Sequence, residues 1–145
     1  MIVHLTDLHI REPGRLAYGR IDTAPYLRTA VESVLRLRQR PHAVVITGDL
    51  TDFGRSGEYA HLAQLLAPLN MPIYLLPGNH DDREQMRRSF PDHGWLGRAG
   101  AFMQYSVQIG GLHLIALDTC DPGKPNGRLD RDRLAWLEAE LEAHK

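Results

Sequence analysis

Three short apolar runs in this chain are each followed at once by carboxylate, imidazole or amide side chains. The first run ends before Asp7 and His9, the second before Asp49, and the third before Asn79. Segments with helical periodicity separate the runs, which is typical of strands alternating with helices in a parallel sheet. The carboxyl ends of parallel strands collect at one edge of such a sheet. The sequence therefore predicts that these side chains share one site.

The remaining pattern predicts an α/β fold with a mostly parallel sheet, flanking helices and a trailing β-hairpin. Gly110 and Gly111 are typical of the turn of that hairpin. In the last helix, which Asp130 can cap, we expect Leu134, Leu137 and Leu141 to face inward. The expected strands are 2–6, 42–47 and 72–76, the hairpin lies within 102–119, and the helices are 22 or 23 to about 40, 56–68, 81–88 and 130 onward.

Composition narrows the class of protein and its partners. Residues 1–145 fit one domain, and the net charge of −1 provides no overall field for nucleic acid or an anionic membrane. The single cysteine, Cys120, excludes an internal disulfide framework and fits a reducing compartment. We therefore expect a cytoplasmic protein that takes a small substrate and binds neither a nucleic acid polymer nor a membrane, with self-association left open.

The residue types at the strand ends are those that hold divalent transition metals. In an extended chain, Asp7 and His9 would point to the same side and offer an oxygen and a nitrogen together. Asp49 could bridge two ions about 4 Å apart, with Asn79 on the second ion. Each residue alone is also typical of a turn, since Asp and Asn often form Asx turns after strands. Three strand ends carrying suitable ligands together favour the metal site.

These residues form motifs that resemble the calcineurin-like metallophosphoesterase family. The chain reads "DLH" at 7–9, "GDLTD" at 48–52 and "GNHD" at 78–81, in the family's order. Within that family it is most similar to the bacterial phosphodiesterases that act on cyclic nucleotides or glycerophosphodiesters. "LAYGRID", 16–22, and "WLEAEL", 136–141, lie where that branch carries similar stretches.

The resemblance implies roles for individual residues. Asp7 and His9 would bind one ion, Asp49 would bridge, and Asn79 would bind the second ion, with Fe, Mn, Zn or Co as candidates. His80 would face the leaving oxygen, and Asp52 would orient His80. The implied reaction is hydrolysis of a phosphodiester by in-line attack of a metal-bound hydroxide.

The resemblance also predicts that the chain is the N-terminal part of a metallophosphoesterase domain. The family completes its site with a later His and a Gly-His-x-His element, which this sequence does not contain. We expect either a piece that lacks the C-terminal portion or a naturally short relative. In either case the chain alone would be weakly active or inactive, and it could hold only one ion.

Other polar and aromatic residues are weaker candidates. Arg11 could hold substrate phosphate, although a solvated loop is the competing interpretation. His113 could replace an absent ligand, but a structural role is favoured. Trp95 and Trp136 are expected to be packing residues.

Three other functions compete with the hydrolase. A non-catalytic module that holds one ion, or that completes its fold with another chain, stays open. A phosphatase with an aspartyl nucleophile is disfavoured, because His9 stands where that chemistry usually places a second carboxylate. A Rossmann dinucleotide site is disfavoured too, because no Gly-x-Gly-x-x-Gly follows the first strand.

Overall fold

The computed structural model describes residues 1–93 and 102–144, and Trp95 lies outside them. The predicted α/β class, with a parallel sheet, flanking helices and a trailing hairpin, is confirmed. The elements along the chain are β1 (Ile2–Thr6), α1 (Ala24–Leu35), β2 (Ala43–Thr47), α2 (Ser56–Leu66), β3 (Ile73–Leu76), α3 (Arg83–Ser89), β4 (Tyr105–Ile109), β5 (Leu112–Ala116) and α4 (Arg131–Ala143).

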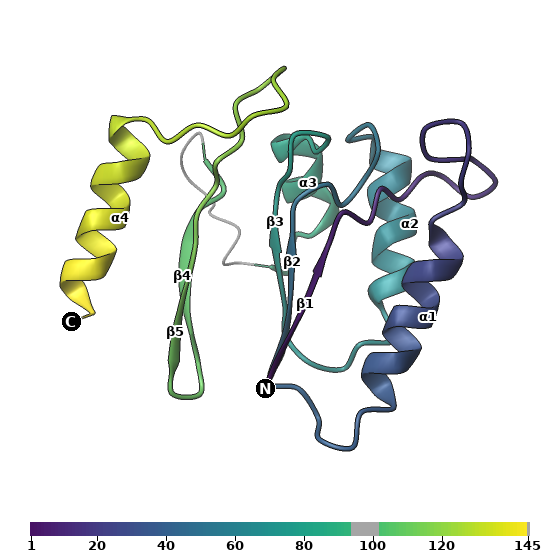
Figure 1. Ribbon diagram of the computed structural model, residues 1–145, viewed down its shortest axis with the longest axis horizontal. Helices are drawn as coiled ribbons and strands as arrows, with labels where there is room; N and C mark the ends of the chain where they lie inside the picture. Colours follow the sequence, from purple (N-terminus) through teal and green to yellow (C-terminus); the bar gives the residue numbers. More distant parts are fainter. Residues whose placement is uncertain (94–101, 145) are drawn as a thin grey trace.

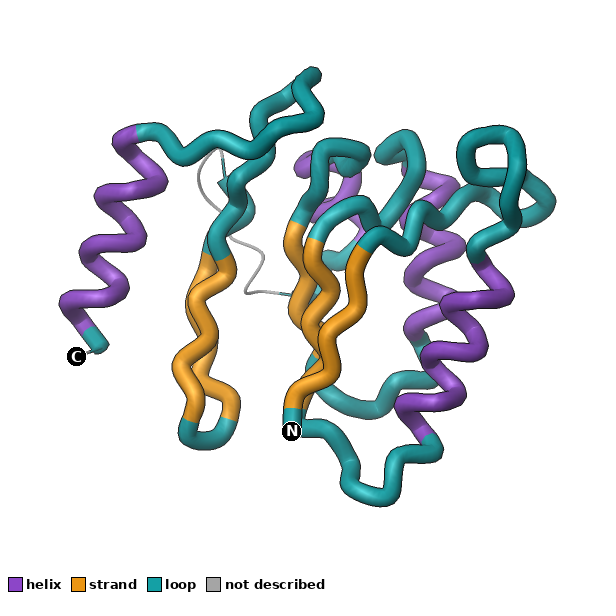
Figure 2. The backbone as a smooth tube through the Cα atoms, viewed as in Figure 1, coloured by secondary structure: helices purple, strands orange, loops and turns teal. Residues whose placement is uncertain are grey.

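Strands β1, β2 and β3 form a parallel sheet in that order, so β2 is central. Its residues 43–46 are all buried, which explains why the run reads as continuously apolar rather than alternating. Figure 1 shows α1 and α2 on one side of this sheet and the β4–β5 hairpin on the other, with α4 beyond the hairpin. The loops that follow the three strands emerge at the same edge (Figure 2).

The hairpin pairs with itself, and within the described residues no ladder joins it to the three-stranded sheet. It is attached through side chains instead. Tyr105 and Met103 are buried in the core, and the Tyr105 hydroxyl donates a hydrogen bond of 2.9 Å to the carbonyl of Leu75 in β3. Burial of Tyr105 raises the pKa of that hydroxyl, which keeps it a donor.

Two expectations about the helices are wrong. Helix α1 ends at Leu35 rather than near residue 40. Pro41 disfavours helical backbone only at the residue directly before it, so it does not account for this earlier end. In α4, Leu134 and Leu141 are 48% and 53% exposed, so these leucines do not face a core. Helical spacing places them on one side of α4, where Leu137 is partly buried but Leu134 and Leu141 are left largely uncovered by the described residues. Trp136, in the same helix, is only partly buried.

Candidate metal centre

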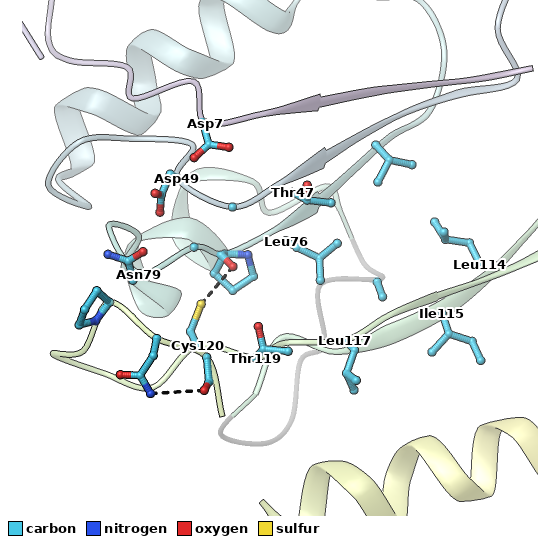
Figure 3. A pocket seen from close by; sticks show the side chains of 18 residues that line it. Asp7, Thr47, Asp49, Leu76, Asn79, Leu114, Ile115, Leu117, Thr119 and Cys120 are labelled. Carbon is cyan, nitrogen blue, oxygen red and sulfur yellow. Dashed lines mark hydrogen bonds between the residues drawn. The ribbon is translucent and has the colours of Figure 1, made fainter. Parts of the chain in front are cut away.

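The predicted strand-end residues do meet at one edge of the sheet. One ligand atom from each of Asp7, His9 and Asp49 lies within 4.8 Å of the others, a separation that one ion could bridge. Asp7 and Asp49 also line a pocket of about 430 Å³ together with Asn79 (Figure 3). Loops after β1, β2 and β3 therefore contribute to one polar centre.

Backbone strain is concentrated at this centre. Among the described residues, the non-glycine positions with positive φ are Asp7 at 55°, His9 at 43°, Tyr18 at 52° and Asp49 at 48°. L-residues adopt this left-handed region at a cost, and such residues cluster at functional sites. The expectation that Asp7 and His9 share a side because the chain is extended is wrong. Strand β1 ends at Thr6, and two left-handed turns aim the side chains instead.

Two glycines let the second and third loops touch. A Cβ atom built on Gly78 would overlap the backbone nitrogen and Oδ1 of Asp49, and one on Gly48 would lie 3.2 Å from the Cα of Gly78. The Asp49 Oδ1 atom then accepts a hydrogen bond of 3.1 Å from the backbone nitrogen of His80. The glycines in "GD" and "GN" thus allow the close approach that positions Asp49.

Asp81 links the same two loops through hydrogen bonds. Its carboxylate accepts hydrogen bonds from the backbone nitrogens of Gly78, Leu50 and Thr51, at 2.9 to 3.1 Å, and from the hydroxyls of Thr51 and Tyr59. Burial raises the pKa of Asp81, and the hydrogen bonds oppose that rise. No role for Asp81 was predicted from the sequence. The acidic residue after "GNH" was the available signal.

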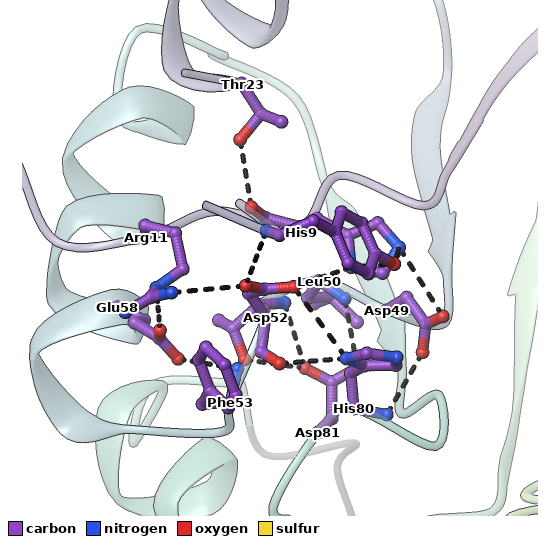
Figure 4. Close-up of polar contacts among 12 residues, drawn as sticks. His9, Arg11, Thr23, Asp49, Leu50, Asp52, Phe53, Glu58, His80 and Asp81 are labelled. Carbon is purple, nitrogen blue, oxygen red and sulfur yellow. Dashed lines mark hydrogen bonds and ion pairs between the residues drawn. The ribbon is translucent and has the colours of Figure 1, made fainter. Parts of the chain in front are cut away.

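Asp52 is buried between the two histidines of the centre (Figure 4). Its Oδ1 atom lies 3.4 Å from Nδ1 of His9 and 3.9 Å from Nδ1 of His80. The backbone carbonyl of Asp52 lies closer to His80, at 2.8 Å from Nδ1. The carboxylate therefore faces His9 more closely, while the peptide oxygen fixes the ring of His80.

Arg11 is directed into the protein and not into the pocket. Its guanidinium lies 2.7 Å from Oε1 of Glu58 and 3.2 Å from Oδ2 of Asp52, and it covers the ring of Phe53 at 4.4 Å. Glu58 is fully buried and also accepts from the backbone nitrogens at Phe53 and Arg55. The result is a chain of charges, Glu58 to Arg11 to Asp52, behind His9 (Figure 4).

Tyr18 is a member of the centre that the sequence analysis missed. Its hydroxyl lies 3.0 Å from Nε2 of His9, and its ring packs at 5.0 Å from the His9 ring. Partial burial, together with the negative charges of Asp52, Asp49 and Asp7, raises the pKa of the Tyr18 phenol. The adjacent Tyr18-Gly19 pair, both left-handed, turns the 12–21 loop back over the centre.

The loop that precedes α1 fixes His9 from the other side. Thr23 donates a hydrogen bond of 2.9 Å to the carbonyl of His9, so the left-handed turn at His9 is held by the start of α1 (Figure 4). Asp22 accepts from the nitrogen of Ala24, two residues on, at 3.1 Å, which is an Asx turn just before the helix.

The far wall of the pocket comes from the segment after β5. Thr119, Cys120 and Asn126 line the pocket, and Figure 3 shows Thr119 and Cys120 across from Asp7 and Asp49. The Cys120 thiol donates to the carbonyl of Pro77, and burial raises its pKa to about 12. Cys120 is therefore a structural thiol and not a nucleophile.

Asp118 anchors this segment. It is fully buried, and its two oxygens lie 2.7 and 2.8 Å from the guanidinium of Arg83 in α3. Burial alone would raise the pKa of Asp118, but the hydrogen bonds from Arg83, Met103 and Cys120 prevail and hold it below the ordinary value. His113, considered as a replacement ligand, is in β5 and groups with residues of α4.

Comparison with known proteins gives a consistent result. A sequence model of the family of calcineurin-like phosphoesterases matches residues 1–143. The chain is 33% identical over 141 residues to a probable glycerophosphodiester phosphodiesterase of Arcobacter nitrofigilis, covering 97% of this chain and 51% of that protein. It is also 33% identical over 145 residues to a cAMP/cGMP dual specificity phosphodiesterase of Mycobacterium tuberculosis, covering 97% and 45%.

A third relative is the 3',5'-cyclic adenosine monophosphate phosphodiesterase of Pseudomonas aeruginosa, 31% identical over 144 residues, with 99% of this chain and 50% of that protein covered. The chain spans about half the length of the curated relatives it matches. Within the described residues, no helix is both long and apolar enough to cross a membrane.

Proposed function

The chain belongs to the calcineurin-like phosphoesterase family, and we propose that it acts in the metal-dependent hydrolysis of a small phosphodiester. The substrate class is a cyclic nucleotide or a glycerophosphodiester, as the names of the relatives suggest. Residues 1–145 form one domain unit that supplies Asp7, His9, Asp49 and Asn79 as metal ligands. The cofactor would be a pair of divalent ions drawn from Fe, Mn, Zn and Co, which these four residues would hold.

The observation that carries this proposal is the gathering of Asp7, His9 and Asp49. Their ligand atoms lie within 4.8 Å of one another, and all three residues hold a left-handed backbone. Two carboxylates and an imidazole match the ligand preference of borderline divalent metals. Strain that is maintained at all three positions supports a binding role over an accidental cluster of turns.

The residues behind the ligands are arranged to orient them. Asp52 and Arg11 hold His9 so that its Nε2 atom lies 3.7 Å from Oδ2 of Asp49. A carboxylate that accepts from the remote nitrogen of a ligating histidine fixes the tautomer and strengthens the ligand. We therefore assign Arg11 to positioning Asp52 and not to contact with substrate.

His80 is suited to proton transfer. A backbone carbonyl can only accept, so the 2.8 Å contact with the carbonyl of Asp52 keeps the proton on Nδ1 of His80. The Nε2 atom is left to exchange a proton with the leaving oxygen. Bound divalent ions would supply positive charge for the phosphoryl oxygens and would lower the pKa of a bound water. The ring of Tyr18 lies 6.1 Å from the ring of His80, so Tyr18 adds a hydroxyl donor to the same site.

The test is hydrolysis of bis(p-nitrophenyl) phosphate by the purified protein in added Mn²⁺, alongside direct measurement of bound metal. We expect the chain alone to show weak turnover that chelation abolishes and manganese restores, with both metal and turnover lost in Asp49→Ala. Bound manganese with no turnover above the Asp49→Ala background would overturn the proposal in favour of a non-catalytic metal-binding module.

A further inference from the structure

A second cluster of metal-ligating side chains lies away from the centre described above. It consists of His113 in β5 with Glu140 and His144 at the end of α4. We propose that this cluster binds one divalent transition-metal ion of the zinc type and joins α4 to the hairpin. In Figure 1, α4 lies on the opposite side of the hairpin from the β1–β3 sheet, so this site is distinct from the strand-end centre.

The side chains already converge on one carboxylate oxygen. Oε2 of Glu140 lies 3.6 Å from Nε2 of His113 and 3.7 Å from Nδ1 of His144. Ligand atoms bound tetrahedrally to zinc at ~2.0–2.2 Å lie roughly 3.4 Å apart. The two imidazole rings stack at 3.8 Å between centroids, which holds both next to the carboxylate. A metal–nitrogen bond lies in the plane of the imidazole, so the rings would turn out of this stack to complete three ligands.

The hydrogen bond of one ring favours a metal-binding tautomer. Nδ1 of His113 lies 3.4 Å from the amide oxygen of Gln108, which is an acceptor, so the proton of His113 belongs on Nδ1. Its Nε2 atom then carries the lone pair, and an outer acceptor on the other nitrogen is the usual support of a ligating histidine. Nδ1 of His144, which lies 2.9 Å from the carbonyl of Glu140, would exchange that contact for the ion.

Two atoms of the cluster are buried without a hydrogen-bond partner. They are Nε2 of His113 and Oε2 of Glu140, the pair separated by 3.6 Å. Leaving such buried atoms without a partner is unfavourable, because they have lost their hydrogen bonds to water. A cation between these two atoms would satisfy both at once. A simple surface cluster of charges would not require a cation.

An ion in this cluster would stabilise the position of α4. Leu134 and Leu141 remain about half exposed, so apolar packing does little to hold this helix. Cross-linking a strand to the last turn of a helix would fix α4 against the hairpin. The proposal does not depend on the phosphodiesterase function, since it uses none of the residues of the strand-end centre.

The test counts the zinc bound by the full chain with zinc alone as the probe, using equilibrium dialysis. We compare Glu140→Gln with the control Glu138→Gln, whose glutamate is exposed on the same helix. Both substitutions are made in the wild-type protein and in an Asp49→Ala background that disables the strand-end centre. We expect Glu140→Gln to lose one zinc equivalent in both backgrounds and Glu138→Gln to lose none.

A second variant, His144→Gln, guards against misfolding, because His144 lies at the exposed end of α4. Zinc should slow amide hydrogen exchange of α4 in the wild-type protein but not in Glu140→Gln or His144→Gln. An unchanged zinc count in both variants relative to Glu138→Gln would overturn the proposal. Failure of the strand-end centre would appear separately, as equal zinc contents with and without Asp49→Ala.

Discussion

The Oδ1 atom of Asp52 lies 3.4 Å from Nδ1 of His9 and is buried with no hydrogen-bond partner among the described residues. The carboxylate is held from behind by Arg11, whose own charge is shared with Glu58. A buried acceptor beside a histidine nitrogen is favourable once that nitrogen carries its proton. This places the lone pair of His9 on Nε2, toward Asp49.

Asp52→Asn tests the role of this pair, because the amide retains the shape but loses the charge. We expect the affinity for Mn²⁺ to fall about 10–100-fold, the usual cost of losing an outer partner of a ligating histidine. Isothermal titration calorimetry measures it, with Asp132→Asn, on the exposed first turn of α4, as the matched control. Equal affinities in the two variants would show that Asp52 does not support His9.

Asp49→Ala and His80→Ala should separate binding from turnover. Asp49 contributes ligand oxygens, so its loss should remove bound metal from the strand-end centre. His80 contacts the centre through its backbone nitrogen and through Asp52, so His80→Ala should retain the metal and slow hydrolysis by about 10²–10⁴-fold. Metal content by elemental analysis, beside the diester assay, decides between these outcomes. Retention of full metal content in Asp49→Ala would refute the bridging role.

Gly78→Ala should destabilise the protein, because the added methyl group would overlap Asp49. We expect the free energy of unfolding in urea to fall by about 1–3 kcal/mol, the usual cost of overpacking. Gly111→Ala is the control, since its added methyl would have no atom within 4 Å. Equal stabilities of the two variants would mean that the Gly78–Asp49 approach is not tight in solution.

Asp118→Asn should reveal a pH-dependent contribution to stability. The folded pKa of Asp118 is below the ordinary value of about 3.9, so its stabilisation is complete above that value and is lost as the pH falls through the lowered pKa. We expect the variant to lose about 3 kcal/mol or more at pH 7, as for a broken buried ion pair. The difference from wild type should shrink below about pH 4.

Urea unfolding at several pH values measures this difference. Asp121→Asn serves as the control, because Lys124, which pairs with Asp121, has an exposed side chain and solvent-exposed ion pairs contribute about 0–1 kcal/mol. A difference between Asp118→Asn and wild type that stays constant down to pH 3 would contradict the assigned ionisation.

Much of this organisation could be predicted from the sequence. Three apolar runs end just before Asp7, Asp49 and Asn79. If the runs are parallel strands, these residues must lie at the shared carboxyl edge of the sheet, and the sheet has that arrangement. What could not be predicted is how the loops fold locally. Periodicity does not indicate that Asp7 and His9 are left-handed, nor that the 12–21 loop returns Tyr18 to the centre.

The position of α4 could not be predicted from the sequence, for a different physical reason. Apolar spacing identifies a side of a helix, but whether that side is covered depends on elements distant in the chain. Leu134 and Leu141 are exposed because the described residues place nothing over them. The cluster of His113, Glu140 and His144 likewise depends on a tertiary contact between β5 and α4 that spacing does not encode.

The most direct test of the strand-end centre is anomalous diffraction from crystals grown with Mn²⁺, with data collected on both sides of the manganese absorption edge. We expect a manganese peak bonded to side-chain atoms of Asp7, His9 and Asp49. Well-ordered density for these three residues with no peak between them, at a manganese concentration that supports binding in solution, would contradict it.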